Sequence, residues 1–176
     1  MKSERRRSPK LVLLLLPLIV FASGFTAAVK AQNSASVVLA GTELTTVVPT
    51  SFYFEGQSAP TQMRNAAAVR FGEKRHVIAG LVDTSGYSTE IAAKYQGFFI
   101  TDSRIKVGGR ELPTGAYGFG FQGETFNIFD VGGNPVMSAA ARNDKALSRP
   151  RPLTMTKNGN EIRLYAGRVY VVIAAN

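Results

Sequence analysis

Turn-forming residues recur at short intervals along most of this chain, and their spacing limits what it can fold into. From Leu44 to the C-terminus, short runs rich in Val, Ile, Phe and Tyr are separated by Gly, Pro, Asn and Ser. Such runs are typical of strands joined by tight turns. The sequence therefore predicts one all-β domain over residues 44–176, an antiparallel β-sandwich or flattened barrel of about eight to ten strands.

Four hairpins can be placed from their turn residues. Asn158-Gly159 is typical of a type I′ turn, because both central positions of that turn need a positive φ. A two-residue loop there would pair Met155 with Ile162 and leave one apolar and one polar face. The four predicted turns are Gly72-Glu73-Lys74, Gly108-Gly109, Gly123-Glu124 and Asn158-Gly159.

Rings alternate with bare glycines in AYGFGF, residues 116–121. If Gly123-Glu124 form the turn, the rings lie on one face of the sheet as a core layer, and Gly118 pairs with Phe129 on the other face. A ring laid over a cross-strand glycine covers backbone that no side chain protects. We therefore expect Phe129 to fill the space above Gly118, and the glycine face to be packed rather than open to a ligand.

One short helix is predicted at Ser88–Tyr95. Ser88 is a suitable N-cap, and Glu90 follows in the first turn. Ile91 and Tyr95 are four residues apart, so both would face the sheet.

The first 31 residues have the order of a secretory signal peptide: a basic head, an apolar run from Leu11 to Phe25, then small residues. Cleavage is expected after Ala31, with Ala28 as the alternative. The apolar run of 15 residues is shorter than the roughly 20 that span a bilayer, so an uncleaved anchor is the less favoured alternative. We therefore expect a periplasmic or secreted protein.

Removal of this leader would leave 145 residues, enough for one domain. Residues 32–43 are small and polar, which predicts a linker or a loosely held first strand. The leader holds six of the 21 basic residues and one of the 12 acidic ones, so the formal charge of +9 falls to +4 without it. The remaining bases are scattered, and no nucleic-acid partner is expected.

The residue types for several kinds of site are missing. There is no Cys, which excludes disulfides, thiolate metal ligands and thiol catalysis. One His and no calcium-loop motif predict no metal site, and the lack of a phosphate-binding loop predicts no cofactor. The chain has no G-x-S-x-G motif, which would supply a nucleophilic Ser for the single His, His76. His76 is therefore expected to be structural, and no catalytic residue is assigned.

The best candidate ligand site is the polar loop DTSGY. Its Asp83, Ser85 and Tyr87 could meet Arg64 and Arg142 in one pocket. An ordinary Asx-type turn explains the same loop and is the favoured interpretation. The five residues are therefore a speculative ligand-binding set.

The segment VGGRELPTGAYGFGF resembles a segment of secreted bacterial β-sandwich domains of unknown function. Leu112, Pro113, Gly115 and Tyr117 carry the resemblance. It implies an exported β-sandwich, and it assigns no functional residue.

Three functions remain as hypotheses. The leading one is an exported, non-enzymatic binding or envelope-associated module with an unknown ligand or envelope component as its partner. The first alternative is an uncommon hydrolase-like enzyme with its site around Asp83–Tyr87. The second is a small outer-membrane barrel, which the short, glycine-rich strands disfavour. The oligomeric state is not predicted.

Overall fold

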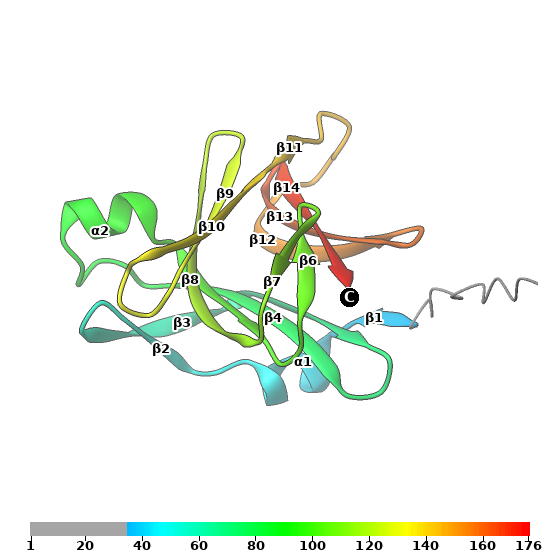
Figure 1. Cartoon of the computed structure of the whole chain (residues 1–176), viewed down its shortest axis with the longest axis horizontal. Coiled ribbons are helices and arrows are strands. Elements are labelled where there is room, and N and C mark those ends of the chain that lie inside the picture. Colours follow the sequence, from blue (N-terminus) through cyan, green and yellow to red (C-terminus); the bar gives the residue numbers. More distant parts are fainter. Residues whose placement is uncertain (1–34) are drawn as a thin grey trace, which may run out of the picture. The chain divides into compact units, whose positions relative to one another are not determined.

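Two antiparallel β-sheets form the part of the chain that the computed structural model describes, residues 35–176 (Figure 1). The predicted leader lies outside these residues. The larger sheet has eight strands: β1 (Ser36–Val38), β2 (Ser51–Phe54), β3 (Gln57–Phe71), β4 (Arg75–Val82), β5 (Gly97–Thr101), β8 (Gly115–Gln122), β9 (Thr125–Phe129) and β10 (Pro135–Ala140). The smaller has six: β6 (Ile105–Val107), β7 (Arg110–Leu112), β11 (Arg142–Asn143), β12 (Arg151–Asn158), β13 (Glu161–Gly167) and β14 (Val169–Ala175).

The predicted all-β class is confirmed. The larger sheet has the order β1-β3-β4-β5-β8-β9-β10 with β2 paired to β3, and the smaller has the order β12-β13-β14-β6-β7 with β11 paired to β14. Several strands, such as β6, β7 and β11, have only two or three residues. With these short strands included, residues 35–176 contain fourteen strands, compared with the eight to ten predicted. Side-chain hydrogen bonds join the sheets near two edges, from Lys157 to the Ser36 carbonyl and from Arg110 to the Ser138 carbonyl.

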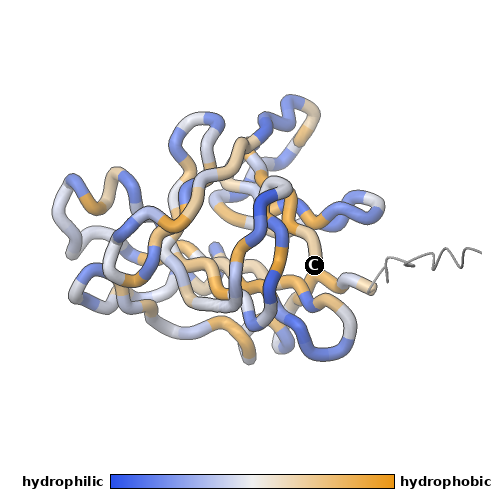
Figure 2. Tube along the Cα trace, viewed as in Figure 1, coloured by the Kyte–Doolittle hydropathy of each residue, from blue (hydrophilic) through white to orange (hydrophobic). Residues whose placement is uncertain are grey.

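The larger sheet is buried on both faces. Its inner face meets the smaller sheet in a core that includes Val69, Val77 and Phe99. Its outer face carries a second core, which includes Ala68 and Ile78 and packs against β2 and the two helices. Burial on both faces explains the continuous apolar runs in these strands, AAAV at residues 66–69 of β3 and VIAGLV at residues 77–82 of β4. The hairpin turns, by contrast, are hydrophilic (Figure 2).

Three predicted turns are confirmed with their registers. Phe71 pairs with Arg75 around the three-residue turn, Ile105 with Leu112 around Gly108-Gly109, and Gln122 with Thr125 around Gly123-Glu124. Gly108 and Gly109 both have positive φ, 57° and 83°, as a type I′ turn requires.

The fourth turn is shifted by one residue from its prediction. Asn158 pairs with Glu161, so the loop is Gly159-Asn160 and Met155 pairs with Leu164 rather than with Ile162. Of the two loop residues only Gly159 has a positive φ, 60°, which is the requirement of a type II′ turn. The shift moves the partner of each residue by two positions, so the predicted apolar and polar faces are preserved.

The predicted helix is present as α2 (Thr89–Lys94). The Ser88 hydroxyl accepts a hydrogen bond from the Ile91 N–H at 3.3 Å, and Tyr95 is fully buried against the sheet. A second helix, α1 (Gly41–Val47), was not predicted. Its N-cap Ala40 offers no capping side chain and the helix contains three Thr, so no sequence signal marks its start.

The expected linker at residues 32–43 is described only from residue 35 onward. There, β1 pairs with the end of β3, from Ser36 opposite Phe71 to Val38 opposite Val69. The first turn of α1 follows.

The glycine face of β8 is packed, as predicted, but by different groups. Gly118 does pair with Phe129, yet a Cβ added at Gly118 would lie 2.4 Å from the ring of Phe54 on β2. A Cβ at Gly120 would lie 2.0 Å from the main-chain oxygen of Lys94 at the end of α2. The expectation that Phe129 covers Gly118 is therefore wrong: Phe129 meets Phe54 edge-on, with ring centroids 6.5 Å apart.

Candidate functional site

The loop after β4 forms the turn that its sequence favours. The carboxylate of Asp83 accepts a hydrogen bond from the Ser85 N–H at 3.0 Å. Hydrogen bonds from the Ser85 backbone and side chain lower the pKa of this carboxyl below its usual value. Tyr87 is buried, and its hydroxyl donates to the Gln57 carbonyl at 3.1 Å. Burial raises the pKa of that hydroxyl.

The two predicted arginines lie away from this loop. Arg64 is exposed on β3, and Arg142 is exposed on β11 in the other sheet, opposite Tyr170. Arg142 lines a pocket, but that pocket contains none of Asp83, Ser85, Tyr87 or Arg64.

A different group of side chains lines a pocket on the outer face of the larger sheet. Arg70 of β3 and His76 of β4 form a cross-strand pair, on the same face as the second core. Helix α1 lies beside them and contributes Thr42, Glu43, Thr46 and Val47. The pocket has a volume of about 310 Å³, and with Leu39 its lining surface is mainly apolar.

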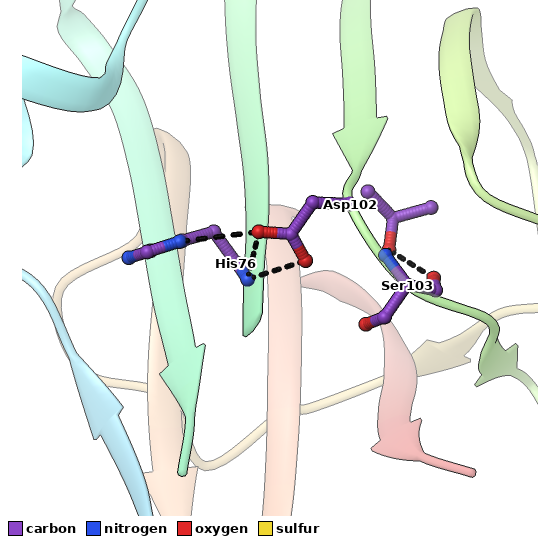
Figure 3. A network of polar contacts seen from close by, with 4 residues as sticks. His76, Asp102 and Ser103 are labelled. Carbon is purple, nitrogen blue, oxygen red and sulfur yellow. Dashed lines mark hydrogen bonds and ion pairs between the residues drawn. The ribbon is translucent and has the colours of Figure 1, made fainter. Parts of the chain in front are cut away.

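His76 is held in a fixed orientation by Asp102, which follows β5 (Figure 3). The Asp102 carboxylate accepts from the His76 backbone N–H at 2.8 Å, and one of its oxygens lies 3.2 Å from the ring Nδ1. Such a carboxylate partner keeps the proton of a neutral imidazole on Nδ1. Nε2 has no hydrogen-bond partner among residues 35–176, so in the neutral ring it can accept a hydrogen bond from a ligand.

The charged groups at the rim are loosely paired. The Arg70 guanidinium lies 3.7 Å from the Glu43 carboxylate, and the two side chains are 30% and 62% exposed. An exposed pair of this kind contributes little to stability. Arg70 and Glu43 can therefore turn toward a bound ligand at small cost.

The His–Asp pair alone does not make a hydrolase. Acyl transfer needs a nucleophile within hydrogen-bond reach of the base. No Ser or Thr hydroxyl in the described part of the chain is hydrogen-bonded to His76. The nearby Ser103 interacts instead with Thr101, whose hydroxyl donates to the Ser103 carbonyl at 2.6 Å (Figure 3).

This pocket was not predicted from the sequence, although one pair of its residues could have been placed together. The predicted turn at Gly72-Glu73-Lys74 already places Arg70 opposite His76 on one face. Asp102 is 26 residues from His76, and α1 carries no sequence signal, so neither could be placed beside the hairpin beforehand.

The described residues, 35–176, contain neither a long apolar helix nor a cluster of metal-binding side chains. No helix there is long and apolar enough to cross a membrane. No group of three or more His, Asp or Glu side chains is arranged to hold a metal ion.

No protein-family model, curated protein or solved structure matches this chain. The resemblance of residues 107–121 to secreted bacterial β-sandwich domains therefore stays a prediction.

Proposed function

We propose that this chain is an exported, non-enzymatic binding module, and that the His76 pocket holds a small ligand with an apolar body and a hydrogen-bonding head. The observation that carries the proposal is the His76 imidazole, fixed through Nδ1 by Asp102 at the edge of a mainly apolar pocket. Apolar walls with a few oriented polar groups are the usual anatomy of small-molecule sites.

The size and chemistry of the pocket narrow the ligand. A volume of about 310 Å³ lies at the lower end of the range for small-molecule pockets, roughly 300–1,000 Å³. The Nε2 lone pair of a neutral His76 accepts a hydrogen bond, so it favours a hydroxyl or another donor on the ligand. The body of the ligand would lie against Leu39 and Val47.

The hydrolase-like alternative gains no support from the loop geometry. Tyr87 is buried and its hydroxyl is already used, while the Asp83 carboxylate closes its own turn. These polar groups of the loop therefore form hydrogen bonds that stabilise the local structure.

Two probes of similar shape test the pocket. 2-Naphthol can donate a hydroxyl to Nε2, whereas 2-methylnaphthalene presents only apolar surface. One net hydrogen bond is worth about 1 kcal/mol, so we expect 2-naphthol to bind about five- to tenfold more tightly in a fluorescence titration near neutral pH. His76→Leu should remove this preference while still binding both probes.

Two further variants make the result decisive. Val47→Asp places a charge in the apolar lining and should weaken both probes. Lys74→Ala changes a turn residue on the same hairpin that is not part of the pocket lining, and should leave both affinities unchanged. Equal affinities of the wild type and His76→Leu for 2-naphthol would refute the proposed role of His76.

Export is tested separately. The full chain, expressed with a C-terminal tag in a Gram-negative host, should be recovered from the periplasm or the medium, and its first residue identified by N-terminal sequencing. We expect the mature chain to begin at Gln32, or at Val29 if cleavage follows Ala28. A chain that keeps residues 1–28 and sediments with membranes would contradict cleavage and favour the anchor.

A further inference from the structure

The smaller sheet carries a second pocket on its outer face. It has a volume of about 260 Å³ and shares no residue with the His76 pocket. Its floor comes from β14, where Tyr170 and Val172 alternate with the inward-facing Val171 and Ile173 of the main core. The turn between β6 and β7 forms one wall, because the Gly108 N–H donates to the Val172 carbonyl at 2.8 Å.

The aromatic part of this floor is held rigidly. The rings of Tyr170 and Tyr165 face each other across β13 and β14, with centroids 5.0 Å apart. The Tyr165 hydroxyl donates to the Asp144 carboxylate at 2.9 Å, and the Arg163 guanidinium lies 4.7 Å from the Tyr170 ring centroid. The floor is therefore preorganised, which reduces the cost of ordering it around a ligand.

The charged side chains at the walls differ in whether they have a partner of opposite charge. Two hydrogen bonds from the Arg163 guanidinium go to one oxygen of Glu161, at 3.1 and 2.8 Å, so these two charges compensate each other. Hydrogen bonding to Tyr165 and Glu161 raises the pKa of Arg163, which keeps it charged. Arg142, by contrast, has no ion pair or side-chain hydrogen bond with any residue in the described range 35–176.

From this arrangement we infer that the pocket binds a small monocarboxylate, with its carboxylate on Arg142 and a short apolar group over Tyr170 and Val172. The planar guanidinium matches a carboxylate with two parallel hydrogen bonds. A single uncompensated positive charge balances one negative charge. A more highly charged anion would leave negative charge unbalanced in the pocket, because Glu161 and Arg163 already compensate each other.

The same site would disfavour other small ligands. A cation would be repelled by the uncompensated charge of Arg142. An uncharged molecule would leave the Arg142 guanidinium without a negatively charged partner. The inference does not rest on the proposed role of the His76 pocket, because the two pockets can be observed and altered independently.

Three compounds with the same branched apolar group test the inference: isobutyrate, isobutylamine and isobutanol. Each is titrated into the isotope-labelled protein, and chemical shifts of Gly109, Val172 and the Arg142 side-chain Nε–H are followed. We expect saturable shifts of these signals with isobutyrate, and affinities at least tenfold weaker for the amine and the alcohol.

Variants at the wall then separate binding at Arg142 from a general attraction to positive charge. Arg142→Gln should weaken isobutyrate at least tenfold, and Arg142→Lys should give an intermediate affinity because an ammonium cannot form the paired hydrogen bonds. Glu161→Gln should bind isobutyrate at least as tightly as the wild type. Arg149→Gln, which removes an exposed charge that does not line the pocket, should leave the affinity unchanged.

Two results would overturn the inference. One is isobutyrate binding that Arg142→Gln leaves unchanged. The other is isobutylamine binding as tightly as isobutyrate. Each variant is compared with the wild type by its amide spectrum, so a lost affinity is counted only where the fold is retained.

Discussion

A methyl group added at Gly120 should weaken the whole domain, because that position lies under the end of α2. The added Cβ of Gly120→Ala would lie 2.0 Å from the Lys94 carbonyl oxygen. Ordinary contact begins at 3.4 Å, so the two must separate by about 1.4 Å. The obstacle is main chain rather than a flexible side chain, and it cannot rotate away.

The segment that must move is clamped to the sheet. The side chain of Gln96 donates to the Phe121 carbonyl at 3.1 Å and accepts from the Phe121 N–H at 3.0 Å, and the Gln96 N–H donates to the Phe119 carbonyl at 2.8 Å. A displacement of α2 stretches these bonds. Lys94 itself is joined to Glu55 at 2.9 Å, so the strain extends to the end of β2.

The expected cost follows from these contacts. Overpacking in a well-packed core costs about 1–3 kcal/mol, and each weakened hydrogen bond adds up to about 1 kcal/mol. Ala gains roughly 0.5–1 kcal/mol over Gly in backbone entropy, which offsets part of the loss. We therefore expect Gly120→Ala to lower the free energy of unfolding by about 2–3 kcal/mol, measured by urea denaturation with circular dichroism.

Gly86→Ala is the matched control. Gly86 lies in the loop before α2, no atom lies within 4 Å of a Cβ added there, and its φ is outside the left-handed region. Its free energy of unfolding should change by no more than about 0.5–1 kcal/mol, in the stabilising direction. If Gly120→Ala were as stable as Gly86→Ala, the glycine face of β8 would not be packed under α2.

Three further predictions concern single groups. Tyr95→Phe should leave the free energy of unfolding unchanged or raise it, because the buried Tyr95 hydroxyl has no hydrogen-bond partner among residues 35–176. Tyr117→Phe should instead lower it by about 1 kcal/mol, because the Tyr117 hydroxyl loses its 3.1 Å bond to the Pro113 carbonyl. A larger loss of stability in Tyr95→Phe than in Tyr117→Phe, measured by urea denaturation, would contradict this. Asp130→Asn should lower Tm at pH 6. Hydrogen bonds from Asn134 and the Gly132 N–H lower the pKa of Asp130 below 3.8, so the stability it contributes is present above that pH and is lost as pH falls further. The difference in Tm between wild type and variant should therefore narrow as pH falls below 3.8, and a difference that is as large at pH 2 as at pH 6 would refute the assignment. Gly109→Ala should cost about 1–2 kcal/mol in urea denaturation, because its φ of 83° is strained for any residue with a Cβ, and an unchanged midpoint would contradict the type I′ turn.

Local rules predicted most of the hairpins of this chain. Turn residues gave the register around Gly108-Gly109 and Gly123-Glu124, because a short loop fixes which residues pair. They misplaced the last turn by one residue, since Gly159 supports two turn types that differ only in which neighbour joins the loop. The alternation of apolar and polar faces survived because both choices keep the same parity.

Contacts between distant segments could not be predicted in this way. Phe54 covers Gly118 from a strand more than sixty residues earlier in the chain, and local pairing offered only Phe129 for that place. Asp102 reaches His76 from the end of β5 for the same reason. Within the predicted ligand set, Asp83 and Ser85 do share a turn, while Tyr87 belongs to the core and Arg142 to the other sheet.

The position of the ligand site is tested most directly by mapping 2-naphthol onto the protein. Amide and imidazole chemical shifts of the isotope-labelled chain are followed as the probe is added. We predict saturable shifts at Thr42, Val47 and His76, with Nε2 of His76 among the most affected nuclei, and smaller changes elsewhere. Two results would contradict a binding pocket between α1 and the outer face of the larger sheet. One is saturation of the protein by the probe with no chemical-shift change at His76, and the other is saturation with the largest shifts on β12 and β13.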